Sequence, residues 1–402
     1  MKNILLLTNI YPMNDPAYDG TPVCHFFTRE WVKQGYNVRV VHFMSLFPRP
    51  YYWVGRLFGK IIAARTGCVT YSHPARQCQK YDVEGVPVMY VPIVKYVPHK
   101  NFSPKRIHAA FNHICQELAA EGFVPDVVTA HFPMPQLEML YLFKQSFPSA
   151  KTCLVLHGDG SQIPTIYSDK YQQYMEAVDV WGFRSLAFQR QFEALYGKHA
   201  NEFLCYSGVP ESFLAPVNKD FSNGVSKFVF VGSLFKLKNV DVTLKALNKA
   251  FPNNDFEFHV VGSGAEEASL KKLTEQLNMT SQVVFHGQMK RADAQQVMLQ
   301  ADCFVMVSSR EAFGLVYVEA MAKACITVAT RGQGIDGVIV DGENGFLCES
   351  GDVEALAETL RRIRSLSPEQ LNIISRKAVE SAQELSDAKV AAHYLNSIFY
   401  IS

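Results

Sequence analysis

The chain is patterned as short apolar runs that alternate with amphipathic stretches along nearly its whole length. The apolar runs lie at 3–8, 38–43, 126–131, 152–158 and 180–185, and again at 228–233, 256–264, 282–287, 303–309 and 326–330. Stretches with helical spacing of apolar residues lie between the later runs, at 240–251, 265–277 and 291–301. Strand and helix in alternation predict parallel, doubly wound sheets of the α/β class.

The pattern restarts after a segment rich in Pro, Gly, Asn and Ser at 215–226, which predicts a domain boundary. A chain of 402 residues is also longer than a single hydrophobic core usually supports. We therefore expect two Rossmann-like domains facing a central cleft, the first over 1–215 and the second over 216–385. The last helical stretch, 386–402, begins at a Ser386 or Asp387 cap and is expected to pack back on the N-terminal domain.

Composition narrows the class of protein. The formal net charge is +1, so no overall charge attracts nucleic acid, and no nucleic-acid partner is expected. Nine cysteines are scattered without a C-x-x-C pair, which favours reduced, buried thiols and a cytoplasmic protein. No apolar run approaches the roughly 20 residues of a spanning helix, and the first apolar run is interpreted as a buried strand instead of a leader.

Two acids flank a turn after the apolar run at 303–309. Glu311 precedes Phe313-Gly314, a helix is expected from about Leu315, and Glu319 falls one turn into it. In a parallel sheet, ligands bind at the carboxyl ends of the strands, so both acids can face one cleft. Gly314 lets the backbone approach a ligand, and the helix start offers amides to an anion. Glu319 is interpreted either as an acceptor for a diol or as an acid that stabilises the helix dipole.

Other charged and polar groups follow strand ends. Lys236 and Lys238 come after the run at 228–233, where a lysine beside free helix amides suits a phosphate; a solvated loop lysine is the equal alternative. His157 comes at the end of the run at 152–158 and is followed by Gly158 and Asp159, and it is interpreted as functional. His131, at another strand end, is interpreted as a structural residue.

Several motifs are absent from the sequence. It has no H-E-x-x-H, no Asp-x-Asp pair and no His/Cys cluster at ligand spacing, so no metal site is expected. The G-x-G at 262–264 is followed by Glu267 where a dinucleotide fingerprint needs Gly or Ala, which disfavours a dehydrogenase.

Basic residues outnumber acidic ones from about 44 to 106, and residues 49–65 interleave them with aromatic side chains. This arrangement suits an anionic membrane surface, and a solvated basic face is an equal alternative.

The segment "SSREAFGLVYVEAMA" at 308–322 resembles the E-x7-E signature of retaining family 4 glycosyltransferases, which have the GT-B fold. Further segments of the second half follow in that family's order, among them "FVFVGSLFKLKNVDVTLKAL" and "GVIVDGENGFLCESGDVEALAETL". The first half is similar more loosely, through a glycine loop near Gly20, "HGDG" and "CYSGVPESF".

The resemblance implies roles for the acids and the turn between them. Glu311 would hold hydroxyls of the donor sugar, and Glu319 the ribose diol of the nucleotide. The backbone amides of 313–315, from Phe313 to Leu315, would hold the pyrophosphate together with Lys238.

The resemblance also extends to residues outside this turn. Met289 would face the base, His157 would lie beside the donor sugar, and the loop at Gly20 would reach the phosphates. Ser233 stands where many relatives have arginine, and Lys236 is a candidate replacement for that cation.

The resemblance therefore implies a retaining, hexosyl-type transferase that moves a sugar from a nucleotide-diphosphate sugar to a glycan or lipid-linked acceptor. Such an enzyme would need no cofactor or metal, because a lysine and helix amides can neutralise the leaving diphosphate. Cell-surface polysaccharide or glycoconjugate synthesis at the inner face of the membrane is the expected setting. One alternative is an inverting GT-B enzyme or epimerase, which the E-x7-E pattern disfavours. The other is a non-catalytic, nucleotide-sugar-binding partner subunit, which Ser233 favours and the intact acids disfavour.

Overall fold

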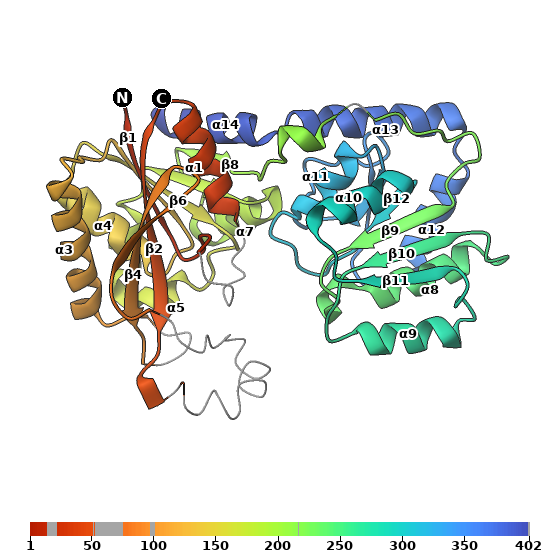
Figure 1. The fold of residues 1–402 in the computed structure, drawn as a ribbon, viewed down its shortest axis with the longest axis horizontal. Helices are drawn as coiled ribbons and strands as arrows, with labels where there is room; N and C mark the ends of the chain where they lie inside the picture. Colours follow the sequence, from red (N-terminus) through yellow and green to blue (C-terminus); the bar gives the residue numbers. More distant parts are fainter. Residues whose placement is uncertain (14–21, 51, 53–74, 97–100, 216, 401–402) are drawn as a thin grey trace. The chain divides into compact units, whose positions relative to one another are not determined.

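The computed structural model describes residues 1–13, 22–50, 52, 75–96, 101–215 and 217–400. The chain forms two compact units (Figure 1). Unit 1 comprises Met1–Phe183, Gln191–Cys205 and Ala391–Ser402, and unit 2 comprises Arg184–Arg190 and Tyr206–Val390. Gly20 and most of the basic segment at 49–65 lie outside the described residues.

Unit 1 is built on an eight-stranded sheet in the order β3-β4-β2-β1-β5-β6-β7-β8. The strands are β1 (Asn3–Thr8), β2 (Asn37–Leu46), β3 (Gln79–Val83), β4 (Val86–Val94), β5 (Val127–His131), β6 (Lys151–Leu156), β7 (Val180–Phe183) and β8 (Glu202–Leu204). Every neighbouring pair is parallel except β3 with β4. The strand order reverses between β1 and β5, so the predicted doubly wound arrangement is confirmed.

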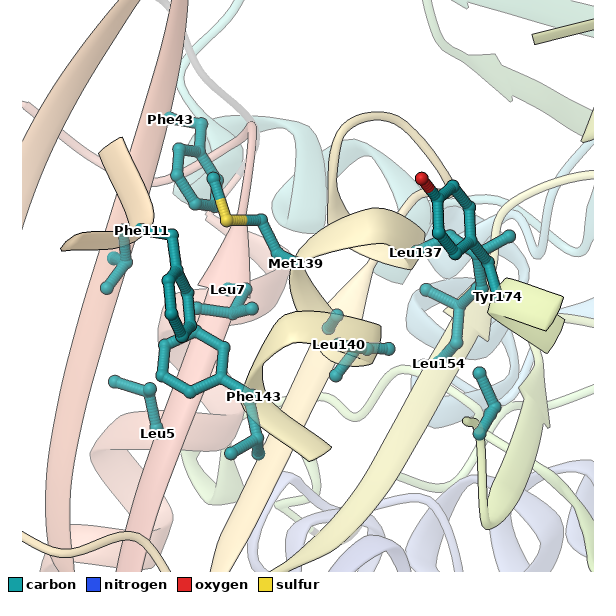
Figure 2. Close-up of a cluster of buried hydrophobic side chains, with 14 of the residues drawn as sticks. Leu5, Leu7, Phe43, Phe111, Leu137, Met139, Leu140, Phe143, Leu154 and Tyr174 are labelled. Carbon is teal, nitrogen blue, oxygen red and sulfur yellow. The ribbon is translucent and has the colours of Figure 1, made fainter. Parts of the chain in front are cut away.

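Helices cover both faces of this sheet, and the core lies between them. They are α1 (Val23–Lys33), α3 (Pro104–Ala120), α4 (Gln136–Ser146), α5 (Ile163–Tyr167), α6 (Tyr171–Met175), α7 (Leu186–Tyr196) and α14 (Asp387–Phe399). Figure 2 shows Phe111 of α3 and Phe143 of α4 beside Leu5 of β1, and the two rings meet edge-on with centroids 5.0 Å apart. At the other face, Tyr394 of α14 packs edge-on against Trp31 of α1.

Unit 2 is built on a six-stranded, wholly parallel sheet in the order β11-β10-β9-β12-β13-β14. The strands are β9 (Lys227–Val231), β10 (Glu257–Val261), β11 (Val283–Gly287), β12 (Cys303–Val305), β13 (Ile326–Thr330) and β14 (Phe346–Cys348). The helices are α8 (Val240–Ala250), α9 (Glu267–Gln276), α10 (Arg291–Gln300), α11 (Leu315–Ala322), α12 (Val353–Arg364) and α13 (Pro368–Gln383). The strand order reverses between β9 and β12, which makes this unit a second Rossmann-like fold.

Four strands were not predicted: β3, β4, β8 and β14. The β3–β4 hairpin turns at Glu84-Gly85, both at positive φ, and β3 exposes most of its side chains, so it lacks an apolar run. Pro87 and Pro92 interrupt β4, and prolines usually argue against a strand paired on both sides. Across the described residues, no helix is long and apolar enough to cross a membrane.

Candidate functional site

The switch point of the unit 2 sheet lies at the carboxyl ends of β9 and β12, where doubly wound sheets bind ligands. β9 leads into the short 3-10 helix η3 (Lys236–Lys238), and β12 leads through an irregular segment into α11. Across this point Lys238 Nζ lies 2.5 Å from Glu311 Oε2, and the two side chains are only 23% and 16% exposed. The structure therefore joins the predicted lysine and the first predicted acid in an ion pair.

Asn239, which the sequence analysis missed, holds the two segments of the switch point together. It adopts a left-handed conformation with φ 52° between η3 and α8. Its Nδ2 donates to Val307 O at 2.7 Å and to Ser309 Oγ at 2.8 Å, and Ser309 N donates to Leu237 O at 2.8 Å. An asparagine directly before an amphipathic run is a signal for the start of a helix, and Asn tolerates the left-handed conformation.

The turn at Phe313-Gly314 and the helix from Leu315 are confirmed. Gly314 has φ 80°, and a Cβ there would lie 2.4 Å from the ring of Tyr317, so only glycine fits. No acidic residue lies in the first turn of α11, and no side chain caps it within the described chain. No acid of the first turn of the helix therefore occupies the positive end of its dipole, which suits an anion.

Glu319 is held from the neighbouring helix α10. Its Oε1 accepts a hydrogen bond from Arg291 Nε at 2.9 Å and lies 2.6 Å from Arg291 Nη2 in the same ion pair, and its Oε2 accepts a hydrogen bond from Gln295 Nε2 at 2.9 Å. The residue is 7% exposed. Burial raises the pKa of Glu319, while Arg291 and Gln295 oppose that rise. Neither partner was identified from the sequence, because a contact between α10 and α11 has no local signature.

The side chain of Phe313 anchors the turn. Its ring is buried and stacks on Tyr206 with centroids 5.1 Å apart. The guanidinium of Arg184 lies 5.5 Å from the same ring and donates to Ser207 Oγ. Burial raises the pKa of Tyr206 to about 12. Arg184 and Tyr206 follow β7 and β8 in the chain, so their place beside this turn was not foreseeable from spacing.

The remaining predicted residues of unit 2 lie in segments that follow β9 and β11. Ser233 is exposed, two residues beyond the end of β9. Met289 is half-buried between β11 and α10. Lys236 is 72% exposed and pairs with Asp241 of α8, with Nζ 3.2 Å from Oδ2. Lys236 is therefore paired with an acid of the helix that follows η3.

His157 belongs to unit 1, at the carboxyl end of β6. Its Nε2 lies 2.9 Å from His131 Nδ1, and its ring stacks on Phe132 with centroids 4.0 Å apart. His131 is fully buried, and its Nε2 lies 3.1 Å from the hydroxyl of Tyr394, which bonds to Thr129 Oγ1 at 2.6 Å. His131 thus links His157 to the C-terminal helix α14.

Metal ligands do not gather in the parts of the chain that the structure covers: no group of three or more His, Cys, Asp or Glu side chains there could hold an ion. The cysteines in these parts are all free thiols.

Comparison with protein families gives a match to the family described as Glycosyl transferases group 1 over residues 216–380. The match covers less than half of the chain, but it includes Lys238, Glu311 and Glu319. The C-terminal part is therefore similar to glycosyltransferases of group 1. Among curated proteins, the chain is 26% identical over 290 residues to N-acetyl-alpha-D-glucosaminyl L-malate synthase of Bacillus anthracis, covering 68% of this chain and 74% of that protein.

Solved structures resemble the chain over nearly its full length. Anabaena Alr3699/HepE in complex with UDP matches with a TM-score of 0.67 and 17% identity, covering 99% of both chains. Sucrose-phosphate synthase from Thermosynechococcus elongatus matches with a TM-score of 0.66 and 16% identity, covering 98% of both. These likenesses, with the two Rossmann-like sheets, confirm the predicted GT-B fold.

Proposed function

We propose that this protein is a retaining, hexosyl-type glycosyltransferase that moves a sugar from a nucleotide-diphosphate sugar to a glycan or lipid-linked acceptor. One observation carries the proposal: the Lys238–Glu311 pair and the uncapped start of α11 meet at the switch point of a glycosyltransferase group 1 domain. Breaking a sugar–phosphate bond leaves a diphosphate, and an ammonium beside helix amides is suited to stabilise that charge without a metal or other cofactor.

The ion pair has a specific part in this scheme. Before the donor binds, Glu311 neutralises Lys238, so a half-buried cation is already held at the switch point. An arriving diphosphate then competes for the ammonium and frees the Glu311 carboxylate to accept hydrogen bonds from sugar hydroxyls. The amides of 313–315 complete the diphosphate site, with Ser233 beside them.

The nucleoside part of the donor is assigned to the neighbouring helix pair. Glu319 would accept from the ribose diol, and Met289, just before α10, would face the base. The solved relative from Anabaena is described in complex with UDP, which makes UDP-sugars the first donors to test. In the N-terminal domain, proposed as 1–215 with the helix at 386–402, His157 and the Gly20 loop would approach the sugar and phosphates.

The acceptor is proposed to belong to cell-surface polysaccharide or glycoconjugate synthesis. The basic segment at 49–65 would hold the protein on the anionic, cytoplasmic face of a membrane. Binding to anionic vesicles at low salt, lost on neutral vesicles, is the expected result.

A transfer assay tests the function. Each of a panel of nucleotide sugars is incubated with the protein, and released nucleoside diphosphate is measured with and without candidate acceptors, with and without chelator. One donor is expected to turn over in both conditions, and proton NMR of the product is expected to show the donor's own anomeric configuration. Glu311→Ala should lower transfer and Glu319→Ala should weaken nucleotide binding, while Glu358→Ala, an exposed acid on α12, should do neither. Wild-type behaviour of both site variants would refute the assignment.

A second candidate is a non-catalytic partner subunit that binds a nucleotide sugar. The observation in its favour is the exposed Ser233 where many related enzymes have arginine, combined with the pairing of Lys236 to Asp241. Tight donor binding with no turnover against any acceptor would select this candidate.

A further inference from the structure

Two residues of α10, Arg291 and Gln295, fix the orientation of the Glu319 carboxylate. Arg291 contacts Oε1 through a hydrogen bond from Nε and an ion-pair contact from Nη2, and the Gln295 amide donates to Oε2. Each carboxylate oxygen has about two acceptor positions. Arg291 therefore occupies Oε1 with its two nitrogen contacts, and the Gln295 bond leaves one acceptor position on Oε2.

Arg291 is itself fixed by packing. Its guanidinium lies 4.7 Å from the ring centroid of Phe213, which belongs to the short helix η2 (Glu211–Phe213). Lys323, which directly follows α11, also contacts Phe213 by donating to its backbone oxygen at 3.0 Å. Stacking on a held ring restricts the rotamers of Arg291, so the carboxylate it binds is restricted as well.

Burying the side chain of Gln295 has a free-energy cost, and packing alone does not explain why a glutamine is present there. The residue is 4% exposed, and within the described residues its side-chain carbonyl oxygen has no hydrogen-bond partner. A buried, unpaired amide oxygen is destabilising, and an apolar side chain of similar size would avoid it. The one strong bond of this side chain is the donation to Glu319, which indicates that orienting the carboxylate is its main contribution.

We propose that Arg291 and Gln295 are positioning residues that hold the Glu319 carboxylate charged and turn its Oε2 toward a ribose diol, so that the site selects ribonucleoside diphosphates over deoxyribonucleoside diphosphates. This inference rests on the proposed function, in which Glu319 binds the ribose. It assigns the selection to a three-residue unit on α10 and α11 instead of to the acid alone.

Charge is the means by which Arg291 acts. Burial raises the pKa of Glu319, and Arg291 is the largest opposing influence, followed by the Gln295 amide and the more distant Lys323. Replacing Arg291 with a neutral side chain removes most of that opposition, so the acid becomes protonated at a higher pH. A protonated carboxyl has lost acceptor capacity for the diol. Nucleotide binding by such a variant should therefore strengthen as the pH rises, whereas binding by the wild type should be flatter over the same range.

The test is calorimetric titration of the full chain with UDP, ADP and GDP and with the 2′-deoxy and 3′-deoxy forms of whichever binds most tightly. The wild type should prefer the ribonucleotide by roughly tenfold or more, as one hydrogen bond to a charged group implies. Arg291→Gln should reduce that preference to about threefold or less at pH 7 and regain part of it at pH 9. Arg291→Lys should retain an intermediate preference, and Lys290→Gln, the exposed neighbouring cation, should retain all of it.

The possible results distinguish a failure of the positioning role from a failure of the proposed donor site. An unchanged preference and a flat pH dependence in Arg291→Gln would overturn the positioning role. No preference for ribose in the wild type, or no binding of any of the three nucleotides, would overturn the proposed donor site instead. Gln295→Met decides the case if Arg291→Gln does not fold, because it also removes the unpaired oxygen. Loss of ribose preference without loss of thermal stability supports positioning, and retained preference contradicts it.

Discussion

Replacing Gly314 with alanine is expected to destabilise unit 2 by about 3 kcal/mol, from two separate causes. The left-handed φ of 80° costs a residue with a Cβ about 1–2 kcal/mol, less about 0.4–1 kcal/mol gained by stiffening the unfolded chain. The new Cβ would also lie 2.4 Å from the Tyr317 ring and 3.0 Å from Glu311 Cγ. Relieving that overlap costs about 1–3 kcal/mol more.

Gly351 provides a matched control for the backbone cost. Its φ is 72°, close to that of Gly314, and a Cβ there would meet nothing within 4 Å. Gly351→Ala should therefore cost only about 1 kcal/mol. The difference between the two variants isolates the steric contribution of the turn.

Urea unfolding followed by far-UV circular dichroism measures both costs, and tryptophan fluorescence provides the internal control. The three tryptophans, at 31, 53 and 181, all belong to unit 1, so their signal reports that unit and not the substituted one. Gly314→Ala should also weaken nucleotide binding, because pushing Tyr317 moves the start of α11. Equal destabilisation by the two alanines would refute the claim that the turn is sterically closed to a side chain.

Three further results are expected. A double-mutant cycle with Lys238→Met and Glu311→Gln, measured by unfolding, should give a coupling free energy of about 1–2 kcal/mol between the two side chains, which is above the range of exposed ion pairs. A coupling free energy near zero would contradict a stabilising ion pair at this position. Asn239→Gly keeps the left-handed backbone but loses the hydrogen bond to Val307 O. The free energy of unfolding should therefore fall by about 2 kcal/mol, and hydrogen exchange of nearby backbone amides should accelerate. Unchanged exchange would contradict the claim that Asn239 holds the two segments together. Burial lowers the pKa of His42 to about 4, below its unfolded value, so the unfolded chain binds the proton first and stability is lost as the pH falls from about 6.5 to 4. That loss, roughly 3 kcal/mol by linkage, should shrink in His42→Asn when unfolding is measured across this range.

The buried strands of both sheets were predictable because a parallel strand that is covered on both faces consists of consecutive apolar residues. Asn3–Thr8 and Ile326–Thr330 are two examples. Strands whose apolar run is short, interrupted by proline or absent were missed. β3 exposes its side chains at an edge, and β8 and β14 are three residues long.

The site was predictable where its residues are close in sequence. Glu311, Gly314 and Glu319 share one strand–turn–helix segment, so their spacing alone suggested a shared role. Arg291 and Arg184 reach this segment from α10 and from the end of β7, and the sequence gives no sign of either contact. Such partners depend on how helices and connecting segments pack, which periodicity does not encode.

The central claim is that the switch point of unit 2 binds a nucleoside diphosphate through Lys238 and the start of α11. The most direct measurement is calorimetric titration of UDP, ADP and GDP into the wild type, Lys238→Met and the exposed-lysine control Lys272→Met, each with and without chelator. The account predicts that one nucleotide binds regardless of chelator, that Lys238→Met weakens it by about tenfold or more, and that Lys272→Met leaves it unchanged. Equal affinity in Lys238→Met and the wild type would contradict it.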